Sequence, residues 1–223
     1  MKKNTLWSRM LLLLLTGMIL LSACGKQDKA QESAVDLARK AVEAGKEPDF
    51  DALKKEDETV IAWLYIPGTK VNDPVSTDSN AGIFLQTEIN SADFSDRGTV
   101  LYGKLSSDGS QFGELQKIYS EDGSLQKYRE ITVFTPEKTL HYEAFCAASF
   151  SDRHVLTNYY LWRFLNSFED FLHDVLNYHS MSRQYDETVT VGEADRLLVL
   201  SCHARQSDDQ RYLILARSVD EAG

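Results

Sequence analysis

A thiol and a guanidinium lie close together near the end of the sequence. Cys202 ends an apolar run that begins at Arg196, and Arg211 begins a second apolar run. Both runs favour β-strands, and the polar segment His203–Gln210 is expected to join them as a loop. A thiolate is a nucleophile and a guanidinium stabilises developing negative charge, so the pair predicts covalent chemistry at a carbonyl group. The alternative is a buried core cysteine beside a surface arginine, because free cysteines usually pack as small apolar residues.

The N-terminus has the pattern of a bacterial lipoprotein signal. Three basic residues within the first nine positions precede an apolar segment from Met10 to Leu21. This segment is shorter than the ~20 residues that a transmembrane helix needs. The string Leu-Ser-Ala-Cys that ends at Cys24 resembles a lipobox, so we expect residues 1–23 to be a signal peptide and residues 24–32 a lipid-anchored tether. The alternative is an uncleaved single N-terminal membrane anchor.

Residues 33–223 are expected to form one domain. The composition of the chain limits the partners that this domain could bind. A net charge of -10 without a basic stripe argues against nucleic acid as a partner. If Cys24 is acylated, the domain lies on the extracellular face of the cell membrane, where a disulfide between Cys146 and Cys202 could form, although their spacing does not demand one. No Cys or His spacing indicates a metal site, and no cofactor is expected.

Short β-favouring runs separated by turns dominate this domain. Helices are expected at Ala34–Ala44, at Phe50–Lys55 and, with an apolar stripe on one face, at Leu161–Tyr178. The expected strands are Thr59–Ile66, Val71–Val75, Ile83–Leu85, Thr99–Tyr102, Glu130–Thr135, Thr139–Ser149, Thr188–Val191, Arg196–Ser201 and Arg211–Arg217. Pro74 marks the second of them as an edge strand. This pattern predicts a mainly β fold, a closed β-barrel with N-terminal helices and one long peripheral helix.

Several of these segments, in this order, resemble the class B sortases. The matching runs are Phe50-Asp-Ala-Leu-Lys-Lys55, Val60-Ile-Ala-Trp-Leu-Tyr-Ile-Pro-Gly-Thr69, Gly82-Ile-Phe-Leu85, Asp93-Phe-Ser-Asp96, Thr99-Val-Leu-Tyr-Gly103 and Gly109-Ser-Gln-Phe-Gly-Glu-Leu115. The long helix stands where class B members carry an extra helix, and the two closing strands match in place and character. Sortases are extracellular cysteine transpeptidases built on a closed β-barrel, so the resemblance, which extends from Phe50 to Val219, implies that fold.

The resemblance also implies a reaction and its partners. Cys202 would attack the carbonyl of a sorting-signal peptide of a surface protein or pilin. The thioester would then pass its acyl group to an amine acceptor of the cell wall or a pilin. Arg211 would stabilise the oxyanion or position the peptide.

Two positions near these residues depart from the family pattern. The family carries a histidine after the Tyr-Gly pair, where this chain has Lys104. Histidine suits proton transfer near neutral pH, whereas Lys104 serves either as a cation that lowers a thiol pKa or as a solvated surface residue. Family members read Thr-Leu-Ser-Thr-Cys at the end of the first closing strand. Matched without a gap, Cys202 takes the threonine position and His203 the cysteine position.

Successive side chains of a strand point to opposite faces, so only one of these two residues faces the site. Cys202 faces it if a bulge or a one-residue shift precedes the strand end, and otherwise His203 does. A further departure is the lipobox, since sortases usually anchor through an uncleaved helix.

These departures leave different functions open. One is a sortase-type transpeptidase with altered acid–base machinery. Another is a catalytically inactive sortase-like lipoprotein that binds a wall peptide or a protein partner. A solute-binding lipoprotein is suggested by the lipobox alone, and the chain is short for a two-lobed binder.

Overall fold

The structure is a computed structural model that describes residues 32–151, 165–178, 183–192, 194–205 and 207–219. The expected signal peptide, the lipid-bearing Cys24 and the tether up to residue 31 lie outside these ranges. From Ala34 onward the chain forms one compact unit. Every helix within the described ranges is too short or too polar to cross a bilayer.

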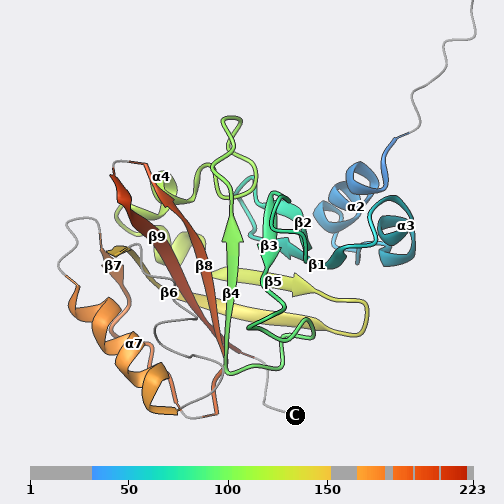
Figure 1. Cartoon of the computed structure of the whole chain (residues 1–223). Coiled ribbons are helices and arrows are strands. Elements are labelled where there is room, and N and C mark those ends of the chain that lie inside the picture. Colours follow the sequence, from blue (N-terminus) through green and yellow to red (C-terminus); the bar gives the residue numbers. More distant parts are fainter. Residues whose placement is uncertain (1–31, 152–164, 179–182, 193, 206, 220–223) are drawn as a thin grey trace, which may run out of the picture. The chain divides into compact units, whose positions relative to one another are not determined.

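A sheet of nine strands dominates the described part of the chain (Figure 1). The strands are β1 (Val60–Tyr65), β2 (Asn72–Ser76), β3 (Ile83–Leu85), β4 (Gly98–Gly103), β5 (Glu130–Phe134), β6 (Thr139–Ser151), β7 (Gln184–Tyr185), β8 (Leu197–Ala204) and β9 (Ser207–Ser218). Their order is β5-β1-β2-β3-β4-β8-β9-β6-β7, and an additional pairing of β5 with β6 closes the sheet into a barrel that leaves β7 outside the ring. The predicted closed β-barrel is confirmed.

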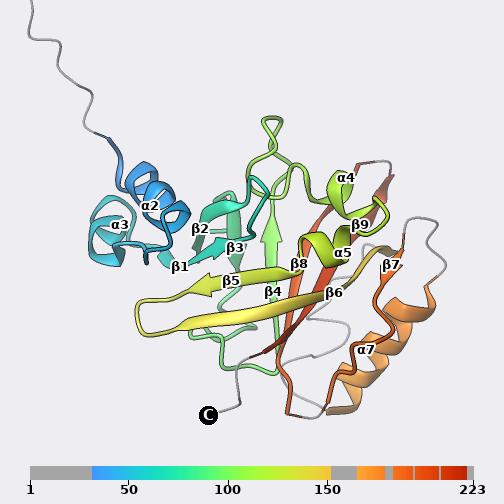
Figure 2. The same ribbon diagram turned by 180° about the vertical axis from the view of Figure 1, so that it is seen from behind.

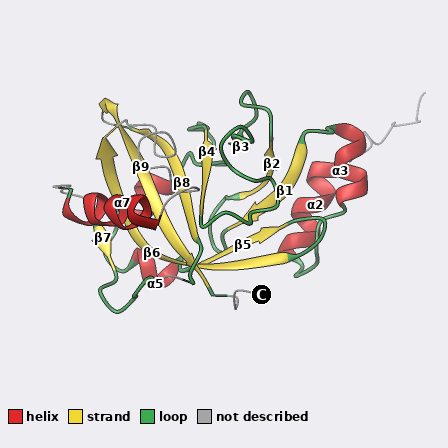
Figure 3. Ribbon diagram, turned by 60° about the horizontal axis from the view of Figure 1, so that its bottom comes forward, coloured by secondary structure: helices red, strands yellow, loops and turns green. Residues whose placement is uncertain are grey.

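Helices lie next to different strands of the barrel. They are α2 (Ala34–Glu43), α3 (Phe50–Glu56), α4 (Leu115–Tyr119), α5 (Ser124–Lys127) and α7 (Leu165–Asn177). All views place α2 and α3 beside β1 and β2, and α7 beside β6 and β7 (Figure 2, Figure 3). The N-terminal helices and the long late helix are therefore found as expected, although the predicted residues 161–164 lie outside the described ranges.

Side chains of β8 alternate between two apolar layers. Leu198 and Leu200 belong to the cluster inside the barrel. Leu197 and Val199 belong to an outer cluster that also contains Phe171 of α7. The strand is thus covered on both faces, which explains why it is a continuous apolar run rather than an alternating one.

The expected edge strand is an interior strand of the sheet. β2 lies between β1 and β3, so the prediction from Pro74 was wrong. Pro74 pairs with Trp63 of β1, whereas the pairing with β3 involves only Val75 and Ser76. The missing proline N–H is therefore not needed on the β3 side.

Two expectations near the C-terminus also change. Thr188–Val191 is not a strand, because the Asp186 carboxylate holds Thr188 in a turn by accepting hydrogen bonds from its backbone N–H (3.0 Å) and its hydroxyl (2.6 Å). The polar loop His203–Gln210 is much shorter than expected. β8 continues to Ala204 and β9 begins at Ser207, and these two residues pair.

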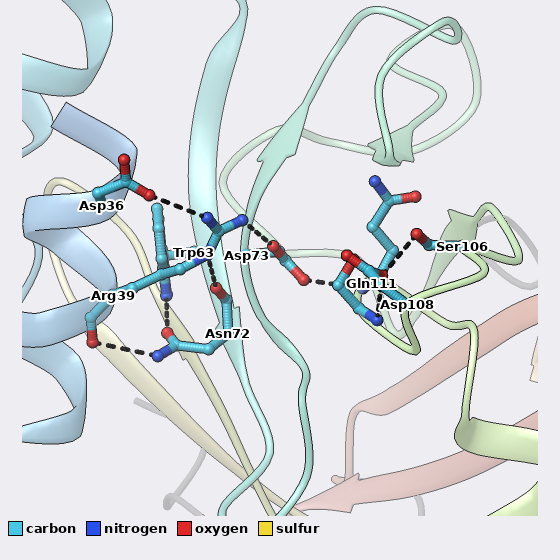
Figure 4. Close-up of polar contacts among 9 residues, drawn as sticks. Asp36, Arg39, Trp63, Asn72, Asp73, Ser106, Asp108 and Gln111 are labelled. Atoms are coloured by element: carbon cyan, nitrogen blue, oxygen red, sulfur yellow. Dashed lines mark hydrogen bonds and ion pairs between the residues drawn. The ribbon is translucent and has the colours of Figure 1, made fainter. Parts of the chain in front are cut away.

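A buried polar network joins α2 to the barrel (Figure 4). Trp63 Nε1 donates a hydrogen bond to Asn72 Oδ1 at 2.7 Å, and Asn72 Nδ2 donates to the Arg39 carbonyl at 3.1 Å. Trp63 is 0% exposed and Asn72 6%, so water cannot replace these partners. One amide side chain thus satisfies an indole N–H and a helix carbonyl together.

We expect Asn72→Ala to lower the free energy of unfolding by about 1–3 kcal/mol, because it leaves the buried Trp63 indole N–H without a partner. Urea denaturation of the chain measures the change. Asn80→Ala is the matched control: the Asn80 side chain is exposed and donates a hydrogen bond to Asp78, so its effect should stay within about 0.5 kcal/mol. Equal midpoints for the two variants would contradict the role given to Asn72.

Candidate functional site

The ends of the parallel strands β4 and β8 meet beside the start of β9. Tyr102 pairs with Ser201, and His203 pairs with Arg211 across β8 and β9. By strand alternation these side chains lie on the same face as the outer apolar layer, to which Tyr102 itself belongs. We call Tyr102, Ser201, His203 and Arg211 the strand-end site.

Ser201 and Tyr102 orient the guanidinium of Arg211. Arg211 Nε donates to Ser201 Oγ at 2.6 Å, and the guanidinium carbon lies 5.3 Å from the centroid of the Tyr102 ring. The Tyr102 ring stacks in turn on Phe84 of β3, with centroids 5.4 Å apart. A cation over an aromatic face is attracted by the ring quadrupole. Burial raises the pKa of Tyr102 to about 12, against the opposing charge of Arg211, so the phenol stays neutral at pH 7.

Cys202 is not part of this site. The side chain is 1% exposed and belongs to the interior cluster, with its Sγ 3.8 Å from the Tyr212 carbonyl oxygen. Burial raises the pKa of the thiol to about 12 and outweighs the opposing charges of Arg211 and Arg205. The expected convergence of Cys202 and Arg211 is contradicted, because the sheet lies between the sulfur and the guanidinium.

The register of β8 explains where the thiol lies. β8 pairs residue by residue with β9 from Leu197 to His203, and the irregularity comes only between His203 and Ala204. A bulge before Cys202 would have rotated it outward, but this one comes too late. Of the two predicted registers, the structure has the ungapped one, in which His203 is exposed on the outer face opposite Arg211.

Lys104 is bound to the loop between β2 and β3. It follows the last residue of β4, and its backbone N–H donates to the Gly82 carbonyl at 2.9 Å. Its exposed ammonium donates to the carbonyl of Asn80, in the loop between β2 and β3. Among the described residues, no hydrogen bond joins Lys104 to Cys202 or His203.

A cavity adjoins the turn that follows the strand-end site. It has a volume of about 540 Å³ and is lined by the segment before α4, by α4 and by Arg205. Arg205 is held there because its backbone N–H donates to Gln116 Oε1 at 2.7 Å and its guanidinium donates to the Gly113 carbonyl. Polar side chains of α4 and Arg205 therefore line this cavity.

The two cysteines of the barrel are free and lie in different layers. Cys146 belongs to the outer apolar cluster, whereas Cys202 belongs to the interior one. Burial raises the pKa of the Cys146 thiol to about 12. In the described ranges, no group of three or more His, Cys, Asp or Glu side chains is placed to hold a metal ion.

Two members of the strand-end site were not predicted as functional residues. His203 and Arg211 were named from the sequence, but Tyr102 and Ser201 were not. Ser201 is the one hydroxyl residue in the apolar run from Leu197 to Cys202, which was an available signal. The role of Tyr102 depends on the pairing of β4 with β8, which joins segments almost one hundred residues apart.

No protein-family model matches the sequence, and no curated protein matches it. Solved structures do match. A Clostridium perfringens sortase B is 18% identical with a TM-score of 0.64, covering 77% of this chain and 100% of that one. A Streptococcus pyogenes class B sortase involved in pilus biogenesis is 21% identical with a TM-score of 0.64, covering 76% and 97%. A Staphylococcus aureus sortase B–substrate complex is 19% identical with a TM-score of 0.62, covering 79% and 86%.

At these identities the likeness establishes the fold alone. The chain has the fold of class B sortases, as the order of its motifs implied.

We expect iodoacetamide to leave Cys202 unlabelled in the folded chain at about pH 8 and to label it in urea, because only a thiolate reacts. Folding raises this pKa from 9.0 to about 12, so labelling should increase, and stability decrease, as the pH rises through that interval. Mass spectrometry of the Cys202 peptide measures the rate.

The variant His203→Cys is the positive control. It places a thiol on the exposed outer face, where labelling should be at least about tenfold faster than at Cys202. Comparable rates at the two positions would contradict the register of β8.

Proposed function

We propose that this chain binds an extended peptide at the strand-end site and forms no thioester with it. One observation carries the proposal: the exposed position on β8 opposite Arg211 holds the imidazole of His203, whereas the thiol of Cys202 is sealed in the barrel interior. The Ser201 hydroxyl, which contacts the guanidinium, is buried and serves as its hydrogen-bond acceptor, so the site favours recognition over covalent catalysis.

The groups of the site suit a peptide backbone. A guanidinium offers several N–H donors in a fixed plane, and Ser201 and Tyr102 restrict its direction. The exposed imidazole of His203 adds a group that donates or accepts. The half-buried ring of Phe84, which stacks on the buried ring of Tyr102, supplies apolar surface for a side chain. The substrate complex of Staphylococcus aureus sortase B, which shares the fold, supports a sorting-signal peptide of a surface protein as the ligand class.

Transpeptidation through Cys202 is less well supported. The reaction needs a thiolate beside the peptide carbonyl and a group that transfers protons, and general acid–base catalysis typically contributes about 10²–10⁴-fold. Turning Cys202 outward would also turn Leu198 and Leu200 out of the interior cluster. An amine acceptor of the cell wall or a pilin would be a partner only if this reaction occurred.

Fluorescence anisotropy with labelled sorting-signal peptides and the full chain in detergent micelles tests the proposal. We expect Arg211→Gln to weaken binding about tenfold or more, because it removes charge-assisted hydrogen bonds to the ligand. Cys202→Ala should bind as well as the unaltered chain. Arg196→Gln, just before the start of β8, is the matched control and should have no effect.

Two results would refute the proposal. One is an acyl adduct on Cys202, or peptide turnover that Cys202→Ala abolishes. The other is peptide binding that is equal in Arg211→Gln and in Arg196→Gln.

We also propose that a lipid on Cys24 holds the chain on the extracellular face of the membrane, which rests on the lipobox pattern. In a Gram-positive host grown with labelled palmitate, the chain should incorporate label and should lose it in Cys24→Ala. Membrane retention without label would favour the single N-terminal anchor instead. Label that persists in Cys24→Ala would exclude acylation at this cysteine.

A further inference from the structure

The loop that follows β4 contacts α2 through Asp73 and also lies near the strand-end site. We call the segment Lys104–Gly113 the rim loop. It begins directly after β4, whose residue Tyr102 belongs to the site. It ends at Gly113, whose carbonyl accepts a hydrogen bond from Arg205 in the turn after His203. The rim loop therefore begins two residues after Tyr102 at one end and contacts the turn two residues after His203 at the other.

Between these ends, the carboxylate of Asp73 joins the rim loop to α2 (Figure 4). Arg39 Nη2 of α2 lies 2.6 Å from Asp73 Oδ1, and the backbone N–H of Gln111 donates to Asp73 Oδ2 at 2.9 Å. The Asp73 side chain is only 5% exposed. A buried carboxylate is stable only when charged or hydrogen-bonding partners compensate its lost hydration. Loss of either the Arg39 or the Gln111 contact would therefore cost free energy.

Gln111, which Asp73 holds in place, contacts Gly82, and Gly82 in turn binds Lys104. Gln111 has a φ of 55°, a conformation that residues with a Cβ rarely adopt unless a specific contact holds them. Its side chain fills the space above Gly82, where a Cβ would come within 2.5 Å of the Gln111 amide. The carbonyl of Gly82 accepts the backbone N–H of Lys104 at 2.9 Å. The contacts thus run from Asp73 through Gln111 and Gly82 to Lys104.

Hydrogen bonds to Asp108 within the rim loop determine its conformation. The Asp108 carboxylate accepts hydrogen bonds from the Ser106 hydroxyl (2.7 Å) and from the Ser110 backbone N–H (2.9 Å) and hydroxyl (2.6 Å). These bonds hold the pKa of Asp108 well below its usual range. Because they do not involve α2, loss of the Asp73 contact should shift the loop as a unit rather than unfold it.

We propose that Asp73 is a positioning residue through which α2 sets the place of the rim loop, and with it Lys104 and Gly113, beside the strand-end site. The inference rests on the proposed function where it concerns ligand affinity, since a displaced rim changes access for a peptide. Its structural part, coupling between α2 and Lys104, stands on the hydrogen bonds alone.

Amide hydrogen exchange in Asp73→Asn, followed by NMR on the full chain in detergent micelles, tests the coupling. Asparagine keeps the size of the side chain but loses the charge that pairs with Arg39. We expect the amides of both Gln111 and Lys104 to exchange at least about tenfold faster, while Val199 in the centre of β8 keeps its rate. Faster exchange at Gln111 alone would overturn the proposal, because Asp73 would then be a local contact only.

Asp36→Asn is the matched control. Asp36 also pairs with Arg39, at 3.3 Å, but this ion pair is exposed and lies within α2. Asp36→Asn should leave the hydrogen-exchange rate of the Lys104 amide unchanged. Equal effects of Asp36→Asn and Asp73→Asn on this rate would overturn the proposal. If Asp73→Asn fails to fold, Arg39→Lys provides the milder test, with the same pair of amides expected to respond.

A labelled sorting-signal peptide tests the ligand part in the same samples. Asp73→Asn should weaken its binding about threefold or more, and Asp36→Asn should not. Faster exchange at Lys104 with unchanged peptide affinity would overturn the effect on the ligand. A peptide that binds none of the chains, the unaltered one included, would refute the proposed function and leave the exchange result to decide the coupling.

Discussion

The uninterrupted pairing of β8 between β4 and β9 is the constraint on which the candidate site depends. Hydrogen bonds on both edges prevent the strand from rotating, so each side chain has only two environments available. Ser201 and His203 face outward, and Cys202 faces the barrel interior. The position of Arg211 follows from the same pairing, because its partner across the two strands is His203.

This constraint places the thiol of Cys202 and the guanidinium of Arg211 on opposite faces of the sheet, although the two residues are close in the sequence. The thiol of Cys202 is surrounded by aliphatic and aromatic side chains, which makes it inert. The guanidinium of Arg211 is held by a hydroxyl and an aromatic ring on the accessible side. Under the proposed function, this surface orients a peptide through hydrogen bonds, and Cys202 forms no thioester with it.

The barrel, its N-terminal helices and the long late helix were predictable because their signals are local. The apolar runs of β8 and β9 and the helical pattern of Ala34–Glu43 each depend on neighbouring residues, and the order of the motifs indicated the sortase fold. The register of β8 was not predictable, because Leu197–Leu200 is apolar on both faces and carries no alternation. Tyr102 and Ser201 escaped notice for a different reason: their proximity to Arg211 arises from pairing between distant strands.

The apolar character of both faces of β8 has a consequence for how such proteins diverge. One residue inserted into the strand ahead of Ser201 would exchange aliphatic side chains between the two layers, so both apolar clusters would have to repack. Only the short polar end of the strand would acquire a new chemical character. A change in length of one codon would thus alter both the reactivity of this surface and the packing of the two layers beneath it.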